Sequence, residues 1–100
     1  MNNKKIVIIE DEPDILEVLS YNLKREGFEV FTAINGTLGL SLVEKKLPDL
    51  VLLDLMLPGM DGIEICSTVK KNPATQNTLI IMVTAKGEES DIVLGLGVGA

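Results

Sequence analysis

One short segment constrains the fold more than any other, the apolar run 50–53 and the residues beside it. The run follows the turn signal Pro48-Asp49 and ends at Asp54. A short, continuous apolar run between turn residues is typical of a strand buried on both faces, as the strands of parallel sheets are. In open sheets of this kind, ligands bind at the carboxyl ends of the strands. We therefore predict that Asp54 lies at a functional edge of a sheet.

Three further apolar runs predict three more strands, with helical patterns between them. The strands are expected over 6–9, 28–31 and 79–83. The helices are expected from Pro13 to Gly27, after a turn at 35–36 from Leu38 to Lys46, and over 61–71, with the start of a weak helix over 87–96. Gly39 lies inside the second helix, where it costs about 1 kcal/mol relative to Ala. Strands that alternate with helices imply right-handed crossovers and a doubly wound parallel sheet. The chain is therefore predicted to be an α/β protein.

The composition of the chain excludes several kinds of function. One hundred residues allow one domain, and the net charge of −6 argues against binding to nucleic acid or to an anionic membrane by this chain itself. There is no histidine, which excludes a histidine base or a histidine zinc site. The single cysteine, Cys66, is expected to be a buried apolar residue, and one cysteine favours a reducing, cytoplasmic setting. No apolar run approaches the ~20 residues of a membrane-spanning helix.

Polar residues follow the ends of three predicted strands. Glu10 and Asp11, Asp54, and Thr84 are expected to meet at one edge of the sheet. Clustered carboxylates repel one another unless a cation lies between them, and oxygen ligands favour Mg²⁺. An aspartate beside Mg²⁺ can attack phosphorus, so Asp54 is the candidate nucleophile. Thr84 is a candidate donor to the phosphoryl oxygens, and Ala85 leaves room for the group.

Two acidic residues next to this cluster receive a different assignment. Glu12 and Asp14 are expected to be solvated or to interact with the dipole of the first helix.

Four segments of the chain, taken together, resemble a known family. They are 8–13, 49–62, 83–86 and 94–100, and their order and spacing are similar to those of the receiver domain of bacterial two-component response regulators, especially regulators with a winged-helix DNA-binding output domain. The resemblance implies a flavodoxin-like, three-layer sandwich with strand order 2-1-3-4. It also implies a phosphorylation-dependent signalling switch that is not an enzyme and that receives a phosphoryl group from a sensor histidine kinase.

The resemblance also implies a role for each site residue. Asp54 would be the phosphoacceptor, and Mg²⁺ would be bound by Asp11, by Asp54 and by the backbone carbonyl of Met56. Glu10 would complete the acidic pocket, often through water. Thr84 would be the switch hydroxyl.

The sequence departs from the family after residue 100. In the family, a fifth strand with an aromatic switch residue, a lysine and a fifth helix follow, so residues 1–100 are interpreted as a receiver domain that is incomplete at its C-terminus. A DNA-binding output domain is expected in the parent protein, not in this chain. Loss of an edge strand and its helix would expose apolar surface, which favours a dimer or a strand-swapped oligomer.

Two other functions compete with the switch. Phosphatases of the haloacid dehalogenase superfamily also use a strand-end aspartate, but their Asp-x-Asp pattern has a second acid where this chain has Met56. A phosphorylation-independent interaction module is the other alternative. The acidic cluster argues against it for the parent protein, whereas for a chain truncated at residue 100 it stays open.

Overall fold

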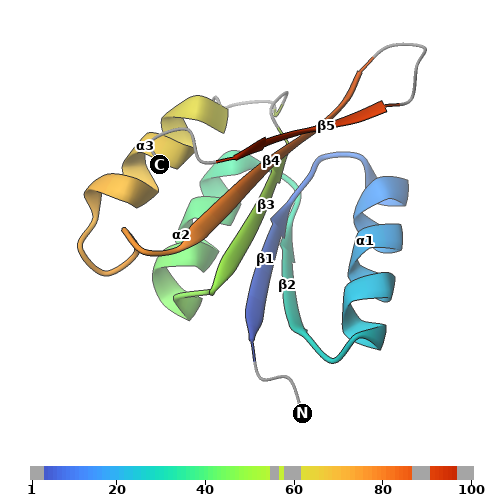
Figure 1. The fold of residues 1–100 in the computed structure, drawn as a ribbon, viewed down its shortest axis with the longest axis horizontal. Helices are drawn as coiled ribbons and strands as arrows, with labels where there is room; N and C mark the ends of the chain where they lie inside the picture. Colours follow the sequence, from blue (N-terminus) through green and yellow to red (C-terminus); the bar gives the residue numbers. More distant parts are fainter. Residues whose placement is uncertain (1–3, 55–56, 58–61, 87–90, 97–100) are drawn as a thin grey trace.

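The protein is described by a computed structural model that covers residues 4–54, 57, 62–86 and 91–96, with the backbone alone for 83–86 and 91–96. The elements follow in the order β1 (Lys5–Ile9), α1 (Pro13–Arg25), β2 (Glu29–Ala33), α2 (Gly36–Lys46), β3 (Leu50–Asp54), α3 (Gly62–Lys71), β4 (Leu79–Lys86) and β5 (Asp91–Leu96). Figure 1 shows α1 on one side of the sheet and α2 and α3 on the other.

The sheet has the strand order β2-β1-β3-β4-β5, and the first four strands are parallel. The predicted order 2-1-3-4 is therefore confirmed. Ile9 of β1 is the register partner of Leu53 in β3, and Asp54 is the partner of Val83 in β4. This register brings the carboxyl ends of β1 and β3 to the same edge of the sheet, which we call the carboxyl edge. The opposite edge, where the parallel strands begin, is the amino edge.

The main core lies between the sheet and the layer formed by α2 and α3. Val7, Ile9, Val51 and Leu53 contribute the strand side of this core. From the helices come Val43, Ile65, Cys66 and Val69, all almost fully buried. Burial of each side chain of this size contributes about 1.5–3 kcal/mol. Cys66, the single cysteine of the sequence, is buried, which agrees with the expectation from the sequence.

Two hydrogen bonds at the amino edge hold the start of β3. The backbone N–H of Lys5 donates to Oδ2 of Asp49 over 2.9 Å, and the buried hydroxyl of Thr78 donates to the Pro48 carbonyl over 3.1 Å. These bonds tie the loop before β3 to the starts of β1 and β4. They therefore help to fix the register that places Asp54 at the opposite end of β3.

Residues 91–96 form a strand, and the helix predicted over 87–96 is wrong where the structure describes it. β5 pairs antiparallel to β4, with Thr84 opposite Val93. The β-branched residues Ile92 and Val93 favour a strand, and Gly95 would weaken a helix. Pairing with β5 also satisfies backbone groups on the edge of β4 that faces away from β3. It extends β4 to Lys86, beyond the predicted end at residue 83.

The ends of the first helix agree with the sequence signals. Pro13 lies in the first turn of α1, and Gly27, after its end, has φ of 97°, a left-handed conformation that glycine adopts without strain. None of the helices in the described part of the chain is long and apolar enough to cross a membrane.

Candidate functional site

Glu10 is the first residue after β1, and both its backbone and its side chain are held. Its backbone N–H donates to the Ala33 carbonyl over 3.0 Å, which continues the pairing between β1 and β2. Its carboxylate Oε2 accepts a 3.0 Å hydrogen bond from the backbone N–H of Glu12. Only 5 % of Glu10 is exposed. A carboxyl group is thus buried and fixed at the carboxyl edge.

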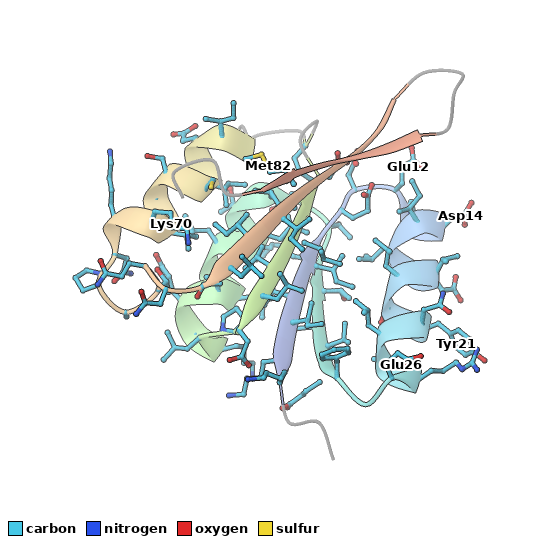
Figure 2. All side chains as sticks on the ribbon, viewed as in Figure 1. Glu12, Asp14, Tyr21, Glu26, Lys70 and Met82 are labelled. Carbon is cyan, nitrogen blue, oxygen red and sulfur yellow. The ribbon has the colours of Figure 1, made fainter. Side chains whose placement is uncertain are left out.

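The carboxylates of Glu10, Asp11 and Asp54 form one cluster. An oxygen from each lies within 4.8 Å of the others. Asp54 is the last residue of β3 and is half-buried, whereas Asp11 is exposed. The predicted meeting of these three residues is therefore confirmed. Figure 2 labels Glu12 and Asp14 at the start of α1, the helix that follows Glu10 and Asp11 in the chain.

The pKa of Glu10 reflects both its burial and the repulsion between the carboxylates of this cluster. The folded protein raises the pKa of Glu10 to about 7, and burial is the largest cause. The hydrogen bond from the N–H of Glu12 lowers this pKa in part, while the charge of Asp54, a hydrogen bond with Asp54 and the charge of Asp11 also contribute to raising it. A cation between the three groups would offset this repulsion, and three carboxylate oxygens match the ligand preference of a hard ion.

The structure gives less information on the other predicted site residues, Thr84, Ala85 and Met56. Thr84 and Ala85 lie inside β4, not after it, because β4 continues to Lys86. Thr84 directly follows Val83, the register partner of Asp54, so its backbone lies near the same edge. The orientation of the Thr84 side chain is outside what the structure describes. Met56, whose carbonyl was expected to bind the metal, also lies outside the described residues.

One contributor to the site was not predicted from the sequence, the backbone N–H of Glu12. Glu12 was assigned to solvent or to the helix dipole, and its side chain is indeed exposed. Its N–H nevertheless orients the Glu10 carboxylate, and its carbonyl accepts from the N–H of Leu16 in α1. The signal in the sequence is Pro13, because a proline at the first helical position places the preceding residue at the N-cap.

Comparisons with known proteins agree with this geometry. Residues 6–100 match the family described as response regulator receiver domain. The chain is 48% identical over 96 residues to the phosphate regulon transcriptional regulatory protein PhoB of Rhizobium meliloti (strain 1021). That match covers 96% of this chain and 42% of the relative, so the chain spans less than half of the relative's length.

Solved structures give the same fold. The N-terminal domain of a response regulator receiver protein from Methanoculleus marisnigri JR1 has a TM-score of 0.78 and 38% identity, covering 85% of this chain and 69% of that one. The response regulator protein TrrA from Thermotoga maritima, in complex with Mg(2+)-BeF, has a TM-score of 0.77 and 37% identity, covering 84% and 71%. These matches favour the signalling interpretation over the phosphatase and the phosphorylation-independent module. The chain belongs to the response regulator receiver domains, which act in phosphorylation-dependent signalling.

Proposed function

We propose that Asp54 is the phosphoacceptor of this receiver domain and that a partner histidine kinase supplies the phosphoryl group in the presence of Mg²⁺. The observation that carries the proposal is the cluster of three carboxylates within 4.8 Å around the last residue of β3. Asp54 is half-buried, so its carboxylate is accessible to a donor while its neighbours restrict its orientation.

The donor set fits Mg²⁺. Asp11 and Asp54 would bind the ion directly, Glu10 would contact it through water, and Met56 would contribute its backbone carbonyl. When bound, Mg²⁺ supplies positive charge that offsets the repulsion within the cluster and the charge of the phosphoryl oxygens. The complex of TrrA with Mg(2+)-BeF supports the same ion for this chain.

The transfer itself is a substitution at phosphorus. A carboxylate oxygen of Asp54 forms a bond to phosphorus while the bond from phosphorus to the donor's imidazole nitrogen breaks, and the released imidazole takes up a proton from water. The chain's residues orient this attack: Glu10, held by the N–H of Glu12, limits where the Asp54 carboxylate lies. The Thr84 hydroxyl would donate a hydrogen bond to the transferred phosphoryl group, and the small side chain of Ala85 would leave space for that group.

The proposal extends to the whole protein. A domain of this kind is a regulator, not a turnover enzyme, and it would control a C-terminal DNA-binding output domain like that of a transcriptional regulatory protein. The acidic chain itself would contact neither DNA nor a membrane. Its reduced cysteine is compatible with the cytoplasm.

The test is the intact mass of the chain before and after treatment with acetyl phosphate and Mg²⁺. We expect a gain of one phosphoryl group that is lost when Mg²⁺ is chelated and absent in Asp54→Asn. Glu44→Gln, at the amino edge, removes one acidic charge away from the site and should be phosphorylated like the unmodified chain. A folded chain that gains no mass would contradict the proposal.

A further inference from the structure

The outer edge of β2 is open in the sheet. Among the strands that the structure describes, β2 is the last at its end of the sheet, and its inner edge is bonded to the β1 segment. On that inner edge the Glu29 N–H donates to the Lys4 carbonyl, and the Ala33 carbonyl accepts from the Glu10 N–H, both over 3.0 Å. Successive residues of a strand direct their backbone groups to opposite edges. The N–H and C=O groups of Val30 and Thr32 are therefore directed to the outer edge.

The sequence of β2 does little to prevent pairing with another strand. Edge strands of natural proteins are commonly protected by lysine or proline, or by charges within the strand. The one charged residue of β2 is Glu29, at its start. The central residues Val30, Phe31 and Thr32 are all strand formers. The open edge is thus suited to accept a further strand.

An apolar groove of about 720 Å³ lies beside this edge, between α1 and β2. Leu16 and Tyr21 line it from the helix, and Thr32 and Ile34 line it from the strand and the residue after it. Ile34 is 55% exposed and Tyr21 is 62% exposed. Figure 2 shows Tyr21 pointing away from the sheet. Apolar surface and unpaired backbone groups therefore occur together on this side of the molecule.

The charges along the groove are complementary to themselves. Glu17 and Lys24 are exposed, line the groove, and lie about two turns apart on α1. If two copies of α1 pack antiparallel about a two-fold axis near Ser20, Glu17 of each copy lies opposite Lys24 of the other. Ser20 also lines the groove, and its small side chain allows the two helices to approach closely.

We propose that the outer edge of β2 and the groove beside it form the interface of a symmetric dimer of this chain. β2 pairs antiparallel with β2 of the second copy about Phe31, so that Val30 of each copy is hydrogen-bonded to Thr32 of the other. Each α1 packs beside the other α1, with the Glu17 and Lys24 pairs on either side of the axis.

The strand pairing and the helix packing are compatible with one two-fold axis normal to the sheet. α1 contacts both β1 and β2, and neighbouring strands lie about 4.8 Å apart. Two helices that each cover two strands would be about 10 Å apart across the new strand pair, which is close to the usual distance between packed helices. Asp54 is in β3, and β1 and β2 separate it from this interface. The inference is therefore independent of the proposed function.

The first experiment uses the unmodified chain at low ionic strength. Sedimentation velocity over a range of concentrations should show a monomer and a dimer with a Kd on the order of 100 µM, since the interface is small. Residue-resolved hydrogen exchange then locates the interface. The amides of Val30 and Thr32 should exchange about fourfold more slowly at about 1 mM than at about 10 µM protein. Exchange at β5, the other terminal strand, should not depend on concentration.

Charge exchange between the paired residues tests the helix contact. Lys24→Glu places like charges opposite each other twice and should weaken the dimer about tenfold. Glu17→Lys/Lys24→Glu restores opposite charges and should return the Kd to within about twofold of the unmodified chain. Lys71→Glu is the matched control, because it makes the same charge change at an exposed site in the last turn of α3, and its Kd should also stay within about twofold. Circular dichroism checks that each variant is folded.

Four results would overturn the inference. They are a monomer at about 1 mM in the unmodified chain, slowed exchange at β5 instead of at Val30 and Thr32, equal weakening by Lys24→Glu and Lys71→Glu, and a double variant as weak as Lys24→Glu. The exchange measurement needs no variant, so the inference stays testable if a substitution impairs folding. None of these results bears on phosphorylation of Asp54, which the intact mass tests separately.

Discussion

Gly39 of α2 packs directly against Ile9 of β1. A Cβ at position 39 would lie less than 3.0 Å from three carbon atoms of the Ile9 side chain, closer than side chains tolerate. The glycine lowers the helix propensity of α2, yet it allows the helix to approach the strand that leads into Glu10 and Asp11. The size of residue 39 and the size of residue 9 are therefore coupled.

The first prediction tests this coupling. Gly39→Ala gains about 1 kcal/mol in helix propensity but costs about 1–3 kcal/mol by overpacking, so we expect a net loss of stability. Ile9→Val removes the Cδ1 atom that would approach the new methyl group most closely, and costs about 0.5–1.5 kcal/mol by itself. In the Ile9→Val background, Gly39→Ala should cost at least about 0.5 kcal/mol less stability than it costs in the unmodified chain. Urea unfolding of the four proteins measures the coupling, and additive effects would contradict it.

The second prediction concerns the end of α2. Leu47 has φ of 50° and ψ of 62°, a left-handed conformation that costs a residue with a Cβ about 1–2 kcal/mol. Leu47→Gly removes this strain but increases the entropy of the unfolded chain, so we expect a gain in stability of about 0.5 kcal/mol. Leu38→Gly, inside the same helix and equally exposed at 52%, should instead lose about 1 kcal/mol. Thermal unfolding of both variants gives the comparison; a loss of stability in Leu47→Gly would show that its side chain outweighs the strain.

The third prediction is a pH dependence of stability in the absence of divalent metal. Because the folded protein raises the pKa of Glu10 from 4.5 to about 7, the folded state holds a proton that the unfolded state releases. The resulting stability is fully present below pH 4.5 and is lost as pH rises through 7. We expect this residue to contribute a loss on the order of 2 kcal/mol between those limits.

Glu10→Gln isolates that contribution, because a neutral amide resembles the protonated acid. With a chelator present, the variant should become more stable than the unmodified chain at pH 8 and show a flatter profile between pH 5 and 8. Glu44→Gln removes one acidic residue near the amino edge and serves as the charge control. Parallel profiles for the unmodified chain and Glu10→Gln would mean that Glu10 is not the group responsible.

Much of the site follows from local sequence signals, whereas its energetics do not. The apolar runs before Glu10 and Asp54 predict two buried parallel strands, and parallel strands bring their carboxyl ends together. The raised pKa of Glu10 depends on burial and on the distance to Asp54, which no local pattern contains. The hydrogen bond from the Glu12 N–H is similarly a property of the folded loop.

The strand β5 shows where local patterns are ambiguous. Ile92, Val93 and Leu96 match one face of a helix, but the first two are also strong strand formers. Pairing with β4 decides between the two, and that pairing depends on which edge of the sheet is available. In the same way, Gly39 is unfavourable for a helix considered alone, and its packing against Ile9 explains it only after α2 and β1 are placed.

The last prediction concerns metal binding at the carboxyl edge. If Asp11 and Asp54 bind Mg²⁺ in the folded state alone, the ion should stabilise the protein by about 2.7 kcal/mol at a concentration of 100 times its Kd. Asp11→Asn removes one carboxylate of the cluster and should abolish most of this stabilisation, while the fold without metal becomes slightly more stable because a repulsive charge near Glu10 is gone. Thermal unfolding with and without Mg²⁺ measures both effects, and Glu44→Gln should respond to Mg²⁺ like the unmodified chain. An equal rise of Tm with Mg²⁺ in Asp11→Asn and in the unmodified chain would place the ion elsewhere. A rise in neither protein would mean that the three carboxylates, although close together, do not bind the ion.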